Sequence, residues 1–159
     1  MNEVRTGGTE TTVGGVQVAL QSVYLKDSSY ESPNGPRLPP NQNWDPKFQL
    51  NMNTSTEELA PEVREVLLTI TVEAKQGDAT LYLVEVKQAG VFAISGASTE
   101  DMKRLIGSFC PSVLFPYARE VVSDLITKGG FPNFVLPLVN FDALFQQASE
   151  TPPQPGMVN

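Results

Sequence analysis

Two runs of alternating apolar and polar residues, joined by a Gly-Asp pair, constrain the fold of this chain more than any other feature. Successive side chains of a strand point to opposite faces, so a period of two predicts strands with one buried face. Gly77 adopts the positive φ of a tight turn without steric cost, which predicts an antiparallel hairpin at Gly77-Asp78. The buried positions should be Val66, Leu68, Ile70, Val72 and Ala74 in the first run, and Tyr82, Val84 and Val86 in the second, with Leu83, Glu85 and Lys87 on the opposite side.

Shorter alternating patterns on the N-terminal side predict two more strands. One covers residues 16–25, with a bulge expected at Ser22, and the other contains Phe48, Leu50 and Met52. Between them lies the segment SPNGPRLPPNQNWDP. Proline lacks a backbone donor and fixes φ, so this segment should form a long ordered loop rather than a helix or a central strand.

Helical patterns fill the C-terminal part of the chain. Ser98 and Asp101 resemble a capping box, and apolar residues at helical spacing follow as far as Phe109. Pro111 should break this helix. The pattern resumes at Tyr117, Val121 and Leu125 and ends at Gly129-Gly130, and Asn140 can cap a final short helix that holds Phe141, Leu144 and Phe145.

Strands followed by helices predict an α+β domain over residues 16–148. We expect a four-stranded antiparallel sheet with a long helix and a short C-terminal helix. Residues 1–15 are polar and rich in Gly and Thr, and they should form a flexible extension. Residues 149–159 should form a disordered, proline-rich tail.

Side chains for catalysis or metal binding are scarce. The chain contains no histidine and one cysteine, Cys110, which is more typical of a small buried residue than of a nucleophile. It has no phosphate-binding glycine pattern, so we expect no cofactor and no bound metal. Glu57 with Glu58, or Glu62 with Glu65, could form acid–base pairs, although clustered Glu on a strand is more typical of a solvated face.

The charge balance bears on partners and location. Eighteen acidic against eleven basic residues give a net charge of −7 and a pI of about 4.5. Such a surface repels nucleic acid and anionic membranes and favours basic partners, although it could serve solubility alone. The N-terminal residues lack the apolar core of a signal peptide, and a single cysteine suits a reducing compartment, so we expect a cytoplasmic protein.

Aromatic residues are frequent in the segments with irregular backbone. Trp44 lies in the proline-rich loop, and several phenylalanines crowd the second half of the chain. These rings could form a core beneath the loop. Alternatively, they could line a groove that accepts apolar segments of other chains.

Five stretches stand out in order along the chain: VYLKDSSYESPNGP, WDPKFQLNMNT, EVKQAGVFAISG, CPSVLFPYAREVVSDLITKGGFP and LPLVNFDALF. Together they resemble the SecB family of protein-export chaperones. The resemblance implies a cytosolic chaperone, assembled as a homotetramer (a dimer of dimers). Such a chaperone holds unfolded secretory preproteins and delivers them to the ATPase SecA.

The resemblance also implies three groups of site residues. SecA would bind at Asp27, Glu31, Leu83 and Glu85; clients would bind at Trp44, Phe141, Leu144 and Phe145; and Val84, Val86 and Gln88 would belong to the oligomer interface.

Three other functions stay open on the sequence. A SecB-like fold could serve a general holdase or a toxin–antitoxin-associated chaperone. The chain could be a structural oligomer, or a small enzyme that works through paired carboxylates.

Overall fold

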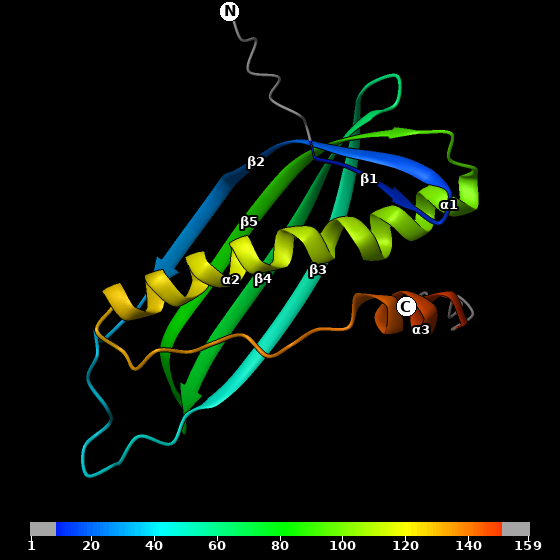
Figure 1. Ribbon diagram of the computed structural model, residues 1–159. Helices are drawn as coiled ribbons and strands as arrows, with labels where there is room; N and C mark the ends of the chain where they lie inside the picture. Colours follow the sequence, from blue (N-terminus) through cyan, green and yellow to red (C-terminus); the bar gives the residue numbers. More distant parts are fainter. Residues whose placement is uncertain (1–8, 151–159) are drawn as a thin grey trace, which may run out of the picture.

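One antiparallel sheet forms the body of the structure, a computed structural model that describes residues 9–150. Its strands are β1 (Thr9–Val13), β2 (Val16–Glu31), β3 (Lys47–Ala60), β4 (Val63–Gln76) and β5 (Ala79–Ser95). They lie in the order β1-β2-β5-β4-β3, so β5 is the central strand. The helices are α1 (Thr99–Arg104), the π-helix η1 (Leu105–Phe109), α2 (Cys110–Lys128) and α3 (Phe141–Glu150). Figure 1 shows α2 crossing one side of the sheet.

The hairpin predicted at Gly77-Asp78 is confirmed. Gly77 has a φ of 60°, and β4 and β5 pair along almost their whole lengths. Val66, Leu68, Ile70, Val72 and Ala74 are all fully buried, as are Tyr82, Val84 and Val86. The alternating pattern therefore identified the covered side of the sheet correctly.

The sheet has five strands, not the four that we expected. The additional strand, β1, lies inside residues 1–15 and pairs with the first residues of β2. Gly14 and Gly15, with φ of 57° and 83°, form the two-residue turn between them. The polar Gly/Thr composition suggested flexibility, whereas β-branched Thr11, Thr12 and Val13 beside a Gly-Gly turn are typical of a hairpin arm. Residues 1–8 and 151–159, the rest of the two predicted flexible ends, lie outside the described residues.

Two bulges interrupt the pairing of β2 with β5. The register shifts between Leu20 and Ser22, next to the predicted bulge, and again between Leu25 and Asp27. A bulge inserts one unpaired residue and lets neighbouring side chains share a face. The second bulge directly precedes Asp27, one of the predicted SecA-binding residues.

The prediction that Pro111 breaks the helix is wrong, because the chain stays helical from Thr99 to Lys128. The wider π turn η1 precedes Pro111, and the Cys110 N–H donates to the Leu105 carbonyl five residues back. Pro111 then occupies the first turn of α2, where a missing N–H costs little.

The core lies between the sheet and α2. Buried side chains of β4 and β5 contact Leu114, Ala118, Val122 and Ile126 of α2, all of which are fully buried. A Cβ atom on Gly90 would lie 2.8 Å from the Leu114 Cδ2, so α2 packs directly on the backbone of β5. This packing leaves the opposite side of the sheet turned away from α2.

Asn140 caps α3, as the sequence predicts. The Ala143 N–H donates to the Asn140 Oδ1 over 3.0 Å. On its inner side, the Phe145 ring covers Gly107 of η1, where a Cβ would lie 2.5 Å from the Phe145 Cδ2. The Ser108 hydroxyl donates to the Asp142 carboxylate beside it. α3 therefore attaches to η1 through one ring and one polar contact.

We expect Asn140→Ala to destabilise α3 by about 1 kcal/mol, because the cap is lost. Hydrogen exchange of the first amides of α3 would measure the change. Asn140→Asp, which preserves the capping oxygen, should retain protection. Equal protection in wild type and Asn140→Ala would show that packing alone holds the helix start.

Candidate functional site

The structure gathers the four predicted SecA-binding residues on the side of the sheet turned away from α2, which we call the open face. Cross-strand register places Glu31 beside Leu83, and Ser29 beside Glu85. Asp27 lies two residues before Ser29 on β2, opposite Lys87. Residues directly opposite each other share a face, so β2 and β5 bring these side chains together although they are far apart in sequence.

Strand β4 adds one more acid to this group. Glu73 lies opposite Leu83 on the far side of β5 and forms an ion pair with Lys75, with Nζ and Oε1 3.2 Å apart. Leu83 is half-buried and thus flanked by Glu31 and Glu73. An apolar side chain surrounded by carboxylates suits a partner that presents basic groups around an apolar contact.

A second polar cluster on the open face joins β2 to β4 across β5, where Ala89 lies opposite Tyr24 and Val91 lies opposite Glu65. The Lys26 Nζ lies 2.6 Å from the Glu65 Oε1, and the Tyr24 hydroxyl donates to the other Glu65 oxygen. The second bulge allows both Lys26 and Asp27 to lie on this face. Glu65 is 8% exposed, so its charge needs these two partners.

These contacts shift the ionisation of all three groups. The pKa of Glu65 is held below its usual value, mainly by the hydrogen bond from Lys26 and next by the hydrogen bond from Tyr24. Burial acts in the opposite direction and has a smaller effect. The same contact raises the pKa of Lys26, and the bond to Glu65 raises the pKa of Tyr24 to about 12. A carboxylate whose pKa is lowered cannot serve as a general acid near neutral pH.

We expect Glu65→Gln to lower the pKa of Tyr24 from about 12 toward its usual value of 10, because the neutral amide no longer favours the protonated phenol. Phenolate absorbance during an alkaline titration would measure it. Folding raises the Tyr24 pKa, so the stability from this bond is complete below pH 10 and is lost as the pH rises through about 12. Folding lowers the Glu65 pKa, so its contribution is complete above its usual pKa and is lost as the pH falls through the lowered value. An unchanged tyrosine titration would contradict this account of the cluster.

The carboxylate pairs considered from the sequence do not form acid–base sites. Glu57 and Glu58 are consecutive on β3. The Glu58 Oε2 lies 3.7 Å from the Arg64 Nη2, and Glu57 lies opposite Glu65 on β4. The Glu62 carboxylate accepts a hydrogen bond from Ser95. Within residues 9–150, no group of three or more His, Cys, Asp or Glu side chains could hold a metal ion. Burial raises the pKa of the Cys110 thiol to about 12, which disfavours the reactive thiolate.

Half-exposed apolar side chains lie on the other side of the sheet, along β3. Phe48, Leu50 and Met52 share this side, and the segment between α2 and α3 runs beside them. The Phe48 ring stacks on Phe134 with centroids 4.5 Å apart. We call Trp44, Phe48, Leu50, Met52 and Phe134 the apolar row.

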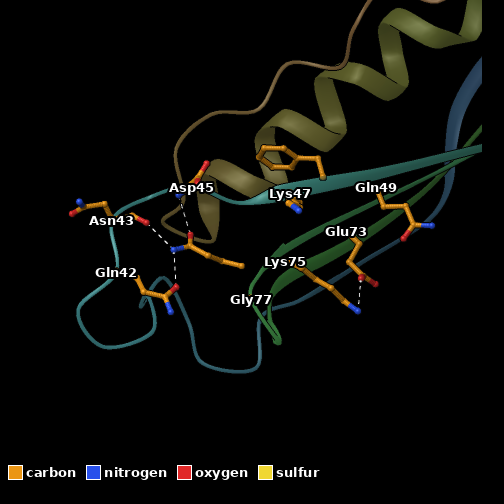
Figure 2. A pocket seen from close by; sticks show the side chains of 10 residues that line it. Gln42, Asn43, Asp45, Lys47, Gln49, Glu73, Lys75 and Gly77 are labelled. Atoms are coloured by element: carbon orange, nitrogen blue, oxygen red, sulfur yellow. Dashed lines mark hydrogen bonds and ion pairs between the residues drawn. The ribbon is translucent and has the colours of Figure 1, made fainter.

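The proline-rich loop places Trp44 at the first end of the apolar row. Gln76, at the end of β4, accepts a hydrogen bond from the Asp45 N–H and donates to the Asn43 carbonyl and the Gln42 side chain, as Figure 2 shows. A cavity of about 640 Å³ lies beside these contacts, lined by the loop, the first residues of β3, the last residues of β4 and Gly77. The Trp44 ring, 38% exposed, lies 6.0 Å from the Phe131 ring, and Phe131 packs on buried Tyr82.

The three predicted client-binding residues of α3 lie at the opposite end of the row. Phe141 packs on Phe115 of α2, Leu144 is 46% exposed, and Phe145 covers Gly107. A cavity of about 610 Å³ beside Phe145 is lined by Thr54 and Thr56 of β3, among others. The span from Phe48 to Thr54 along a strand is about 20 Å, so Trp44 and Phe145 mark two ends of one surface rather than one cluster.

Sequence reasoning missed the contribution of β3 and of the segment after α2 to this surface. The alternation of Phe48, Leu50 and Met52 predicts a half-exposed strand face but does not by itself indicate a binding site. Two sequence features together could have indicated this surface: the alternation of apolar and polar residues in β3, and the segment rich in Phe and Leu between α2 and α3.

The predicted interface residues Val84, Val86 and Gln88 are buried within the single chain. They lie on the central strand, on the side of the sheet that α2 covers. The Gln88 Nε2 donates to the Tyr24 carbonyl over 3.1 Å, so this side chain supports β2 next to its bulge. β1 covers the outer edge of β2 only as far as Leu20, which leaves the rest of that edge unpaired within the described chain.

The helices of residues 9–150 include none that is long and apolar enough to cross a membrane.

Comparison with known proteins agrees with the resemblance in the sequence. The family model described as "Preprotein translocase subunit SecB" matches residues 12–151. The chain is 50% identical to the "Protein-export protein SecB" of Nitrosococcus oceani over 135 residues, which cover 84% of this chain and 82% of the relative. It is 47% identical to that of Legionella pneumophila (strain Corby) over 134 residues, with the same shares covered.

A solved structure shows a similar fold. It is a SecB-like chaperone, Rv1957 of Mycobacterium tuberculosis, in complex with a peptide from the antitoxin HigA1. The TM-score is 0.65 at 16% identity, over 77% of this chain and 91% of that one. With a family model matching most of its length and relatives at this level of identity, the chain belongs to the SecB family, whose members are chaperones and not enzymes.

Proposed function

We propose that this chain is an ATP-independent holdase that binds unfolded secretory preproteins in the cytoplasm and delivers them to SecA. The observation that carries the proposal is the separation of two surfaces on opposite sides of one sheet. The acidic open face suits a basic folded partner, and the apolar row suits an extended apolar segment. A client and SecA could then bind at the same time.

The apolar row has the chemistry for weak, tolerant binding. Rings and unpaired β3 backbone recognise apolar segments without requiring a particular sequence. The chain should act as a homotetramer built from two dimers, because several linked rows raise avidity by about 10² to 10⁴ without any new contact. The effect of Val84, Val86 and Gln88 on assembly would be indirect, because these residues of β5 pack beside β2 and support its position in the sheet.

The fold alone does not select the client. The solved relative from Mycobacterium tuberculosis binds an antitoxin peptide, and a general or toxin–antitoxin-associated holdase would share the fold. The export names of relatives at 45–50% identity favour secretory clients for this chain.

Size-exclusion chromatography with light scattering, in the presence and absence of a freshly diluted unfolded precursor, tests the proposal. We expect a particle of about four times 17.3 kDa that forms a stoichiometric complex without ATP. A monomer that does not bind the precursor would overturn both the assembly and the holdase function. Binding of a non-secretory unfolded protein with equal affinity would favour the general holdase.

A further inference from the structure

A lysine lies inside the acidic group of the open face. Lys87 is the direct cross-strand neighbour of Asp27, and its Nζ is 3.9 Å from the Glu85 Oε1. On β4 its neighbour is Thr69, which carries no charge. Lys87 therefore lies between two of the four residues that we assign to SecA binding.

Its contact with Glu85 is the loosest of the ion pairs on this face. The Lys26–Glu65 and Lys75–Glu73 pairs are 2.6 Å and 3.2 Å long. The side chains of Lys87 and Glu85 are 38% and 41% exposed. An exposed pair at this distance contributes little to stability and can be replaced by another cation without a large penalty.

We propose that Lys87 competes with the basic groups of the docking partner for Asp27 and Glu85, and so sets the affinity and specificity of the open face. This inference rests on the proposed docking of SecA at that face. A partner with a single cation gains little, because it must displace Lys87 and then faces its positive charge. The open face favours a partner that binds both carboxylates at once. Such a partner must also leave Lys87 close to solvent or to an acidic group of the partner.

Lys87→Gln tests the inference in the full-length chain. We expect SecA to bind about threefold more tightly at low salt, because one repulsive charge within a Debye length is removed. The gain should disappear near 1 M salt, where the Debye length is about 3 Å. Lys87→Arg retains the charge and can form two hydrogen bonds to the Glu85 carboxylate through its guanidinium group. It should therefore weaken SecA binding about twofold. Lys128→Gln on α2 makes the same change in net charge away from the open face and should leave the affinity unchanged.

The outcomes separate this inference from the function on which it rests. If Glu85→Lys leaves SecA binding intact, the docking face itself is misassigned. If Glu85→Lys weakens binding while Lys87→Gln leaves it unchanged or weakens it, the competing role of Lys87 is overturned. Thermal unfolding shows whether Lys87→Gln and Lys87→Arg fold like the wild type. If only one of them folds, its SecA affinity still shows whether Lys87 competes with the partner.

Discussion

Glu85→Lys is expected to weaken SecA binding by about tenfold or more while client binding stays nearly intact. Glu85 is central in the acidic group, with Ser29 and Thr71 as its cross-strand neighbours and Lys87 on the same strand. Reversing its charge removes one attraction and places a second cation next to Lys87. Each change is worth up to about 1 kcal/mol at an exposed site, and together they reach a factor of ten or more.

Surface-based binding measurements with SecA at several salt concentrations would give the affinity and its salt dependence. Because exposed charges steer encounter, most of the loss should appear in the association rate and should diminish at high salt. Glu100→Lys, which makes the same charge change on α1, provides the control. Equal loss of client and SecA binding by Glu85→Lys would show that the open face is not a separate partner site.

Trp44→Ala and Phe145→Ala are each expected to weaken binding of a long unfolded client by about tenfold. Large aromatic rings are enriched among the residues that contribute most to such interfaces, and a tenfold loss on truncation corresponds to about 1.4 kcal/mol. The two rings mark opposite ends of a surface about 20 Å long. A short apolar peptide should therefore be sensitive to one substitution and not to the other, whereas a long client should be sensitive to both.

Fluorescence titration with one short and one long unfolded client would measure these losses. Leu59→Ala, on the same strand β3 and 50% exposed, removes an apolar side chain outside the apolar row and provides the matched control. If Trp44→Ala or Phe145→Ala mainly dissociates or unfolds the protein, the ring belongs to the core and not to a client surface. The folding control matters most for Phe145→Ala, because the Phe145 ring also packs α3 against Gly107.

Local sequence specifies the features that depend on near neighbours. Alternation of apolar residues sets the β4–β5 hairpin and its buried side, and Ser98 and Asn140 mark two helix starts through hydrogen bonds that span three residues. The absence of histidine excludes imidazole chemistry in this chain whatever its fold. Such features can be predicted because the interacting groups lie within one turn of helix or one strand pair.

Long-range strand pairing determines which distant residues meet. Asp27 and Glu31 join Leu83 and Glu85 only because β2 pairs antiparallel with β5 and a bulge shifts its register, and neither is fixed by local periodicity. The same central position of β5 buries Gln88 beside Val84 and Val86 within the single chain, although a polar residue at that position is not predicted to be buried by periodicity alone.

Two further differences concern single elements. β1 becomes a strand because the edge of β2 offers it unpaired backbone groups. Pro111 is accommodated because the π turn η1 precedes it and places it in the first turn of α2, where a missing N–H costs little. Trp44 and Phe145 are separated by the part of β3 from Phe48 to Thr54, although both belong to aromatic-rich segments. Local patterns in the chain therefore specify the fold class, most of the elements and the family, whereas pairing and packing between distant segments set the strand number, the grouping of charges and the extent of the apolar row.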